Sequence, residues 1–135
     1  MAGKTQAQTD AVLNVLRATN ITAPATVYVS LFSAAPVNDN AEGTEIAGGG
    51  YARQSITFAA PAAGTGTKRK VTNTNVITFG PATGADWLAA THFGIHSAVS
   101  GAGNMLYWDA LTAAKTVQVG DSAQFAAGQL EVDED

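Results

Sequence analysis

The sequence contains no cysteine and no apolar run near the roughly 20 residues that a membrane-spanning helix needs. The lack of cysteine excludes a disulfide framework, a thiolate metal site and a thiol nucleophile. The first residues, MAGKTQ, have no apolar stretch of the kind found in signal peptides. We therefore expect a protein that has no membrane partner and is assembled in a cytoplasm.

Charged residues are also scarce, at 13% of the 135 residues. The 7 Lys and Arg residues are outnumbered by 11 Asp and Glu residues, which gives a net charge of −4. This acidic balance argues against nucleic acid as a specific partner, because nucleic-acid binding rests on basic surface. Ala, Gly and Thr take the place of the missing charge, and such a composition suits a chain that buries surface against neighbouring subunits.

One segment near the N-terminus has the apolar spacing of a helix. It predicts a helix over residues 5–19, with Thr5 or Thr9 as the N-cap and Asn20 near its end. Pro24 prevents the helix from continuing. The stripe is formed by Val12, Val15, Leu16 and Thr19. A helix this short is unstable alone in water, so it must dock on its own sheet or on another chain.

From residue 25 onward the apolar period changes from 3.6 to 2, which is typical of strands. In Thr26–Phe32 both alternating faces carry apolar side chains, which predicts a strand buried on both sides. Pro36–Gly50 is expected to be a long loop, of a length typical of functional or mobile loops, and Pro61–Gly66 is expected to be a second, flexible segment. Further strands are expected at Tyr51–Phe58, Arg69–Thr72, Asn75–Phe79, Thr91–Ser97, Met105–Asp109, Lys115–Val119, Ala123–Ala126 and Gln129–Val132. The pattern predicts one mainly β domain over residues 1–135, an antiparallel β-sandwich or barrel of seven to eight strands at 25–132 with one N-terminal α-helix.

Residue patterns typical of metal or catalytic sites are weak. His92 and His96 have the spacing of a helical zinc pair, but they lie in an expected strand, where they would be roughly 13 Å apart. The acidic loop residues Asp39, Glu42 and Glu45 do not follow the calcium-loop pattern. The glycine runs do not precede a helix, so they lack the free amides of a phosphate-binding loop. The sequence has no nucleophile-elbow motif. A Ser–His–Asp triad forms in space and cannot be judged from sequence spacing alone. We expect no metal, no cofactor and no enzyme activity.

Two groups of residues are candidates for partner contacts. Arg53 and Tyr51 lie on one face where the long loop re-enters the sheet, and Arg53 has three possible acidic partners: Glu42, Glu45 or an acid on another subunit. A solvated Arg53 is the alternative. The basic run Lys68, Arg69 and Lys70 would contact an acidic protein surface or phosphate, or would simply form a solvated edge that discourages aggregation. The acidic end, Asp133–Asp135, is expected to be solvated.

Segments from the N-terminal helix to Val132 resemble a family of short tailed-bacteriophage virion proteins, often labelled phage tail fibre proteins. The most specific segment is GGGYAR at residues 48–53. Other matching segments keep their order along the chain: ATVYVSLF at 25–32, THFGI at 91–95, LYWDAL at 106–111 and FAAG at 125–128. The resemblance implies a structural role in the virion, with no catalysis.

The resemblance leaves two locations open. A fibre shaft needs a long repetitive stretch along which to trimerise, and the sequence has none. A small β domain with an N-terminal helix suits a capsid cement or decoration protein, and we therefore expect a homotrimer that binds the major capsid protein and stabilises the shell. The alternative is a tail fibre or receptor-binding tail component.

Overall fold

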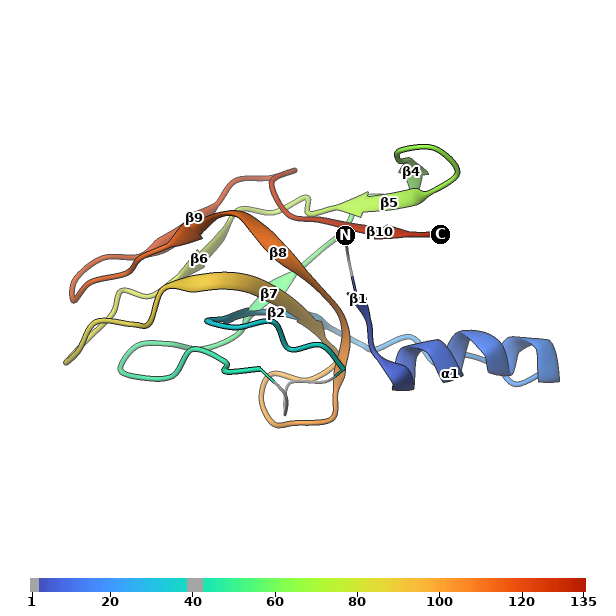
Figure 1. Cartoon of the computed structure of the whole chain (residues 1–135), viewed down its shortest axis with the longest axis horizontal. Helices are drawn as coiled ribbons and strands as arrows, with labels where there is room; N and C mark the ends of the chain where they lie inside the picture. The colour runs from blue at the N-terminus through green and yellow to red at the C-terminus, as the bar shows by residue number, and fades with distance from the viewer. Residues whose placement is uncertain (1–2, 39–42) are drawn as a thin grey trace.

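The strands pair into three antiparallel sheets that surround one hydrophobic core (Figure 1). The structure is a computed structural model that describes residues 3–38 and 43–135. The elements are β1 Gly3–Lys4, α1 Gln6–Asn14, the 3-10 helix η1 Val15–Arg17, β2 Val27–Phe32, β3 Gln54–Ile56, β4 Ala62–Ala63, β5 Arg69–Thr72, β6 Ile77–Phe79, β7 Ala90–His96, β8 Met105–Lys115, β9 Ala123–Phe125 and β10 Glu131–Glu134.

The largest sheet has five strands in the order β1-β8-β7-β2-β3. At its centre Val29 lies opposite Ile95 and Leu31 lies opposite Phe93, and all four side chains point into the core. The other face of β2 is also covered, because Ser30 and Phe32 are fully buried. The alternation in Thr26–Phe32 therefore correctly predicts a strand with two buried faces.

Two smaller sheets lie across the core from the large one. One has the order β10-β5-β4 and the other pairs β6 with β9. Phe79 and Phe125 from the β6–β9 pair meet edge to face, with ring centroids 6.1 Å apart. This arrangement confirms the prediction of a mainly β, antiparallel fold with one N-terminal helix. The described residues form ten strands rather than seven to eight, because β1 and β4 have two residues each and are too short to show alternation.

The N-terminal helix is shorter than the predicted 5–19. Thr5 is the N-cap, and its side chain accepts a hydrogen bond from the backbone N–H of Gln8 at 3.3 Å. The 3-10 turn η1 ends at Arg17 because Ala18 adopts a left-handed conformation with φ 57°. The helical segment therefore ends two residues before the predicted end at residue 19.

One loop prediction and one strand division also need correction. Residues 61–66 include β4, which pairs with β5, and are not an unstructured segment. The described parts of the long loop are held by bridges from Glu45 to Phe32 and from Gly49 to Thr83. The predicted strands at 105–109 and 115–119 are replaced by the single strand β8, which ends at Lys115.

Candidate interaction surfaces

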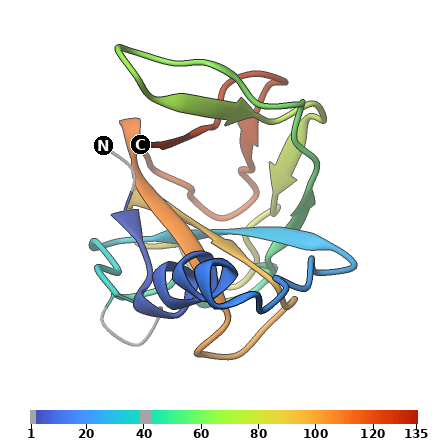
Figure 2. The same ribbon diagram turned by 90° about the vertical axis from the view of Figure 1, so that its right-hand side faces the viewer.

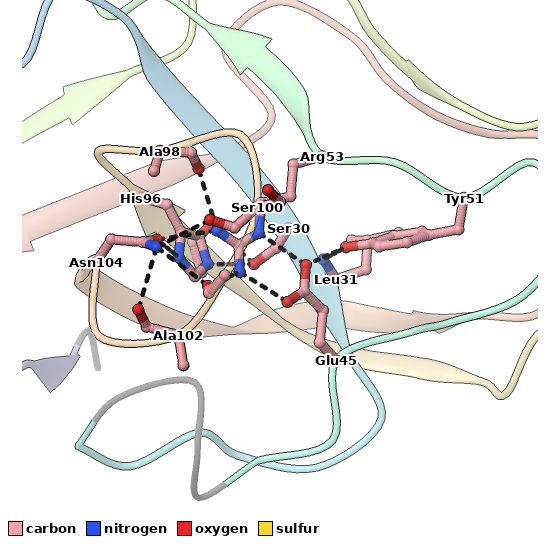
Figure 3. Close-up of polar contacts among 12 residues, drawn as sticks. Ser30, Leu31, Glu45, Tyr51, Arg53, His96, Ala98, Ser100, Ala102 and Asn104 are labelled. Carbon is pink, nitrogen blue, oxygen red and sulfur yellow. Dashed lines mark hydrogen bonds and ion pairs between the residues drawn. The ribbon is translucent and has the colours of Figure 1, made fainter.

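Arg53 lies at the centre of a polar cluster beside β2 (Figure 3). Its side chain is 2% exposed and forms two parallel hydrogen bonds with Glu45, from Nε to Oε1 and from Nη2 to Oε2, both 2.8 Å long. The sequence offered three acidic partners for Arg53, and the structure identifies Glu45. Glu42 and Asp39 lie outside the described residues.

The remaining Arg53 donors hold the loop between β7 and β8. Nη1 donates to the carbonyl of Ala98 at 3.1 Å and to Oδ1 of Asn104 at 2.9 Å, and Nη2 donates to the carbonyl of Gly101 at 2.8 Å. The Asn104 amide nitrogen in turn donates to carbonyls of the same loop, including that of Ser100 at 3.1 Å. All five guanidinium donors are thus used within the chain, and this satisfies the charge of a buried Arg.

The cluster continues to a buried histidine. His96 Nδ1 lies 2.9 Å from Asn104 Oδ1, and its Nε2 lies 2.7 Å from Ser30 Oγ. Because Asn104 Oδ1 is an acceptor, Nδ1 carries the proton and Nε2 accepts from the Ser30 hydroxyl. Burial, together with the positive charge of Arg53, lowers the pKa of His96 to about 4. His96 is therefore neutral near pH 7.

The order Ser30–His96–Asn104 has the hydrogen-bond pattern of a nucleophilic triad. However, Ser30 and His96 are both 0% exposed, so the hydroxyl has no contact with solvent. The backbone of Gly94 also packs closely against this pair. A Cβ at that position would lie 2.9 Å from Ser30 Oγ and 3.0 Å from His96 Nε2, so no space is left there for a substrate. The arrangement is suited to holding β2, β7 and the 97–104 loop together.

Tyr51 approaches the same carboxylate from the core. Its hydroxyl donates to Glu45 Oε1 at 3.0 Å and accepts from the backbone N–H of Leu31 at 3.0 Å. Burial and the Glu45 charge raise the pKa of Tyr51 well above its ordinary range. Burial would also raise the pKa of Glu45, but the hydrogen bonds and charge of Arg53 outweigh it and hold that pKa below its usual value. Tyr51 and Arg53 therefore face inward, and their role as partner contacts stays a prediction.

The basic run lies at the start of β5, with Lys68 just before the strand, beside the acidic C-terminal strand. Lys68 pairs with Asp133 at 3.0 Å and Lys70 pairs with Glu131 at 2.9 Å. The expected solvated end at Asp133–Asp135 is thus wrong in part, because β10 extends to Glu134 and pairs with β5. Arg69 is exposed, and its Nη2 donates to the carbonyl of Pro61 at 2.8 Å. Contacts of Lys68, Arg69 and Lys70 with a partner stay predictions.

His92 and His96 both lie on β7, as the sequence predicts, and point to the face opposite Phe93 and Ile95. His92 bonds to the Thr91 hydroxyl at 2.8 Å and lies beside Trp108, so the two histidines have different neighbours. Across residues 3–38 and 43–135 no group of three or more His, Asp or Glu side chains is placed to hold a metal ion. Over the same residues, no helix combines the length and apolar character needed to cross a membrane.

A second surface is formed by residues 5–24, which we call the N-terminal arm. None of the residues of α1 and η1, all of which the structure describes, is buried. Leu16 is 85% exposed, and Leu13 and Val15 are each more than half exposed. The arm contacts β8 of the large sheet at its base, where the Thr5 hydroxyl donates to the carbonyl of Met105, but these apolar side chains stay uncovered. Docking of the arm on another chain stays a prediction.

A third surface is an apolar groove of about 540 Å³, which we call the mouth, between the large sheet and the β10-β5-β4 sheet. Its apolar walls include Val27, Phe58, Val71, Ile95, Tyr107 and Val132. This volume lies in the range typical of ligand and peptide pockets. Burial raises the pKa of the Tyr107 hydroxyl at its wall to about 12, and a hydrogen bond with Glu134 adds to this.

Sequence reasoning missed Ser30, His96 and Asn104 as members of the Arg53 cluster. The one signal pointing to a buried cluster is Arg53 itself, a rare cation in a charge-poor chain. Asn104 reads as an ordinary turn residue, because its bonds to His96 and Arg53 join parts of the chain that only the fold brings together.

Comparison with known proteins agrees with the resemblance seen in the sequence. None of the curated proteins matches the chain. A family model described as "Podophage GP4 fiber I protein gp80" matches residues 3–133, nearly the whole chain. The chain therefore belongs to the podophage GP4 fiber I protein gp80 family of bacteriophage virion proteins.

Proposed function

We propose that this protein is a fibre subunit of a short-tailed phage particle and acts through binding surfaces rather than through catalysis. Family membership makes it a bacteriophage structural protein located in the virion. The observation that carries the finer proposal is the family description, which names a fibre protein and matches residues 3–133. A fibre subunit needs a rigid domain and adhesive surface.

The geometry supports a building block of this kind. The Arg53 cluster is largely buried, and its donors and acceptors bond to one another within the chain. The N-terminal arm and the mouth instead offer apolar surface, the kind of surface that protein partners cover. The homotrimer expected from the sequence belongs to this proposal, since a small domain gains stability by sharing buried surface.

Capsid decoration is the second candidate. It is favoured by the absence of a repetitive shaft in the sequence and by the single small β domain that the described residues form. In that case the partner would be the major capsid protein, and the arm would be the segment to seat on the shell.

Deletion of the gene for this chain separates the two candidates. Fibre function predicts full, heat-stable particles that adsorb poorly to cells and regain adsorption when the protein is supplied. Decoration predicts normal adsorption together with loss of DNA from the shell at a lower temperature. Particles that show neither defect would contradict both candidates.

A further inference from the structure

The N-terminal arm concentrates uncovered apolar surface. Among the described residues, ten large apolar side chains are exposed, and five of them lie on the arm: Val12, Leu13, Val15, Leu16 and Ile21. Four of these five lie within residues 12–16, and large exposed apolar patches mark interaction sites. α1 projects from one end of the domain in Figure 1, away from the sheets. The arm therefore presents a surface suited to contact with a neighbouring molecule.

The base of the arm is fixed to the domain. Thr5 is 1% exposed, its hydroxyl donates to the carbonyl of Met105 at 2.8 Å, and its N–H donates to the carbonyl of Leu106 at 3.0 Å. At the next residue, the N–H of Gln6 donates to Oδ1 of Asn38 at 3.0 Å. The arm thus points in a set direction, which lowers the entropic cost of docking.

The mouth opens at the same end of the domain as the arm. Figure 2 faces this end and shows α1 below and the β4–β5 hairpin above, and the lining of the mouth includes Pro24 from the arm and Pro61 and Arg69 from the hairpin. Of the arm, only Pro24 lines the mouth. The apolar walls are therefore left uncovered by the chain's own helix, and each copy carries both an unpartnered projection and an unpartnered groove.

The two surfaces carry one pair of exposed charges of opposite sign, and the arm also carries the exposed cation Arg17. Asp10 is exposed on the arm one turn before Leu13, and Arg69 is exposed on the rim of the mouth. Neither side chain forms a salt bridge with any of the described residues. An arm placed in the mouth with Leu13 and Leu16 inward brings a carboxylate to a rim that carries a guanidinium.

We propose that the N-terminal arm of one copy packs into the mouth of a second copy of this chain. Because arm and mouth are different surfaces, the contact closes either as a reciprocal pair or as a ring, and the proposed homotrimer is the three-copy ring. The inference goes beyond the proposed function, since self-association is measured in solution without the particle. Failure of the arm–mouth contact is therefore distinguishable from failure of the proposed fibre role.

Cross-linking tests the contact directly, because the chain has no cysteine of its own. Chains carrying only Leu16→Cys are mixed with tagged chains carrying only Pro61→Cys, a residue on the lining of the mouth. We expect a disulfide between the tagged and untagged chains. A mixture of Leu88→Cys and Pro61→Cys is the control, since Leu88 is 63% exposed but lies outside the arm.

Sedimentation supplies the second readout. We expect the unmodified chain to form oligomers, Leu16→Asp to weaken self-association by about tenfold or more, and Leu88→Asp to leave it unchanged. A monomeric unmodified chain, an oligomer that Leu16→Asp does not weaken, or disulfides that join only Leu16→Cys to Leu16→Cys would each overturn the proposal. The last result would mean that arms pack on one another instead.

Discussion

Arg53 and Glu45 are joined by two parallel hydrogen bonds of 2.8 Å, in a chain where only 13% of residues are charged. The same guanidinium binds the carbonyls of Ala98 and Gly101, so one side chain connects the residue just before β3, the long loop and the β7–β8 loop. A buried cation with all its donors used holds these segments in one arrangement. Removing either partner leaves a buried charge without compensation.

Arg53→Lys is expected to lower the free energy of unfolding by about 3 kcal/mol, because an ammonium lacks the planar fork that bonds Glu45 through two nitrogens and reaches the loop carbonyls. Denaturant unfolding measures this change. Arg69→Lys is the matched control, since Arg69 is exposed and has no salt bridge to the described residues. Equal, small effects of the two substitutions would contradict the structural role of Arg53.

Acid is expected to destabilise the protein through His96. The folded-state pKa is about 4 against an ordinary 6.5, so the unfolded chain binds more protons between these values. The contribution of His96 to the free energy of unfolding is therefore fully present above pH 6.5. It falls by about 3 kcal/mol as the pH drops toward 4. Glu45 acts in the same direction at lower pH, because its pKa is also lowered on folding.

Unfolding measured at pH 7 and at pH 4.5 checks this dependence. The unmodified chain should lose more stability between the two pH values than His96→Gln, which has no imidazole in the cluster. His92→Gln, on the same strand but outside the cluster, should keep the full loss. If His96→Gln and His92→Gln lose the same stability between pH 7 and pH 4.5, the buried neutral His96 is not the source of the acid sensitivity.

Gly94→Ala tests how tightly the cluster is packed. The added Cβ would lie 2.9 Å from Ser30 Oγ and 3.0 Å from Met105 Sδ, so we expect a loss of about 1–3 kcal/mol. Removing the Ser30 hydroxyl makes room for the methyl group. The double variant Ser30→Ala/Gly94→Ala should therefore be less destabilised than the sum of the single variants, and strict additivity would contradict the close contact.

The C-terminal strand provides a prediction that separates packing from surface charge. Val132 is 6% exposed in the core, whereas Glu131 is exposed and pairs with Lys70. Val132→Ala is expected to lower the free energy of unfolding by about 2 kcal/mol, and Glu131→Ala by less than about 1 kcal/mol. Thermal unfolding checks the order, and a larger effect at Glu131 would show that charge, not the core, holds β10 in place.

Local patterns predicted the parts of the fold that depend on neighbouring residues. The two-sided alternation of β2 can be read from a few consecutive side chains, and the N-cap, Thr5, is one of the two candidates that the sequence offers, with Thr9 the other. The scarcity of charge also makes Arg53 a candidate for a specific salt bridge, and its observed partner, Glu45, is one of the acids that the sequence offers.

The missing parts depend on long-range pairing. β10 was expected to end in solvent because nothing in the sequence reveals that Val132 faces Val71 across the β5–β10 pair. Ser30, His96 and Asn104 meet only after β2 and β7 are in register, so their hydrogen-bond chain has no sequence signature. Strands of two residues, such as β1, are too short for periodicity to detect.

The position of this chain on the intact phage particle tests the proposed function most directly. A cryo-electron microscopy reconstruction of purified particles would locate density that matches the five-stranded sheet with its projecting N-terminal helix. A fibre subunit predicts that this density lies in fibres outside the capsid shell. Density seated over the capsid subunits would contradict a fibre role and establish decoration instead, and particles without the chain would contradict a virion structural role altogether.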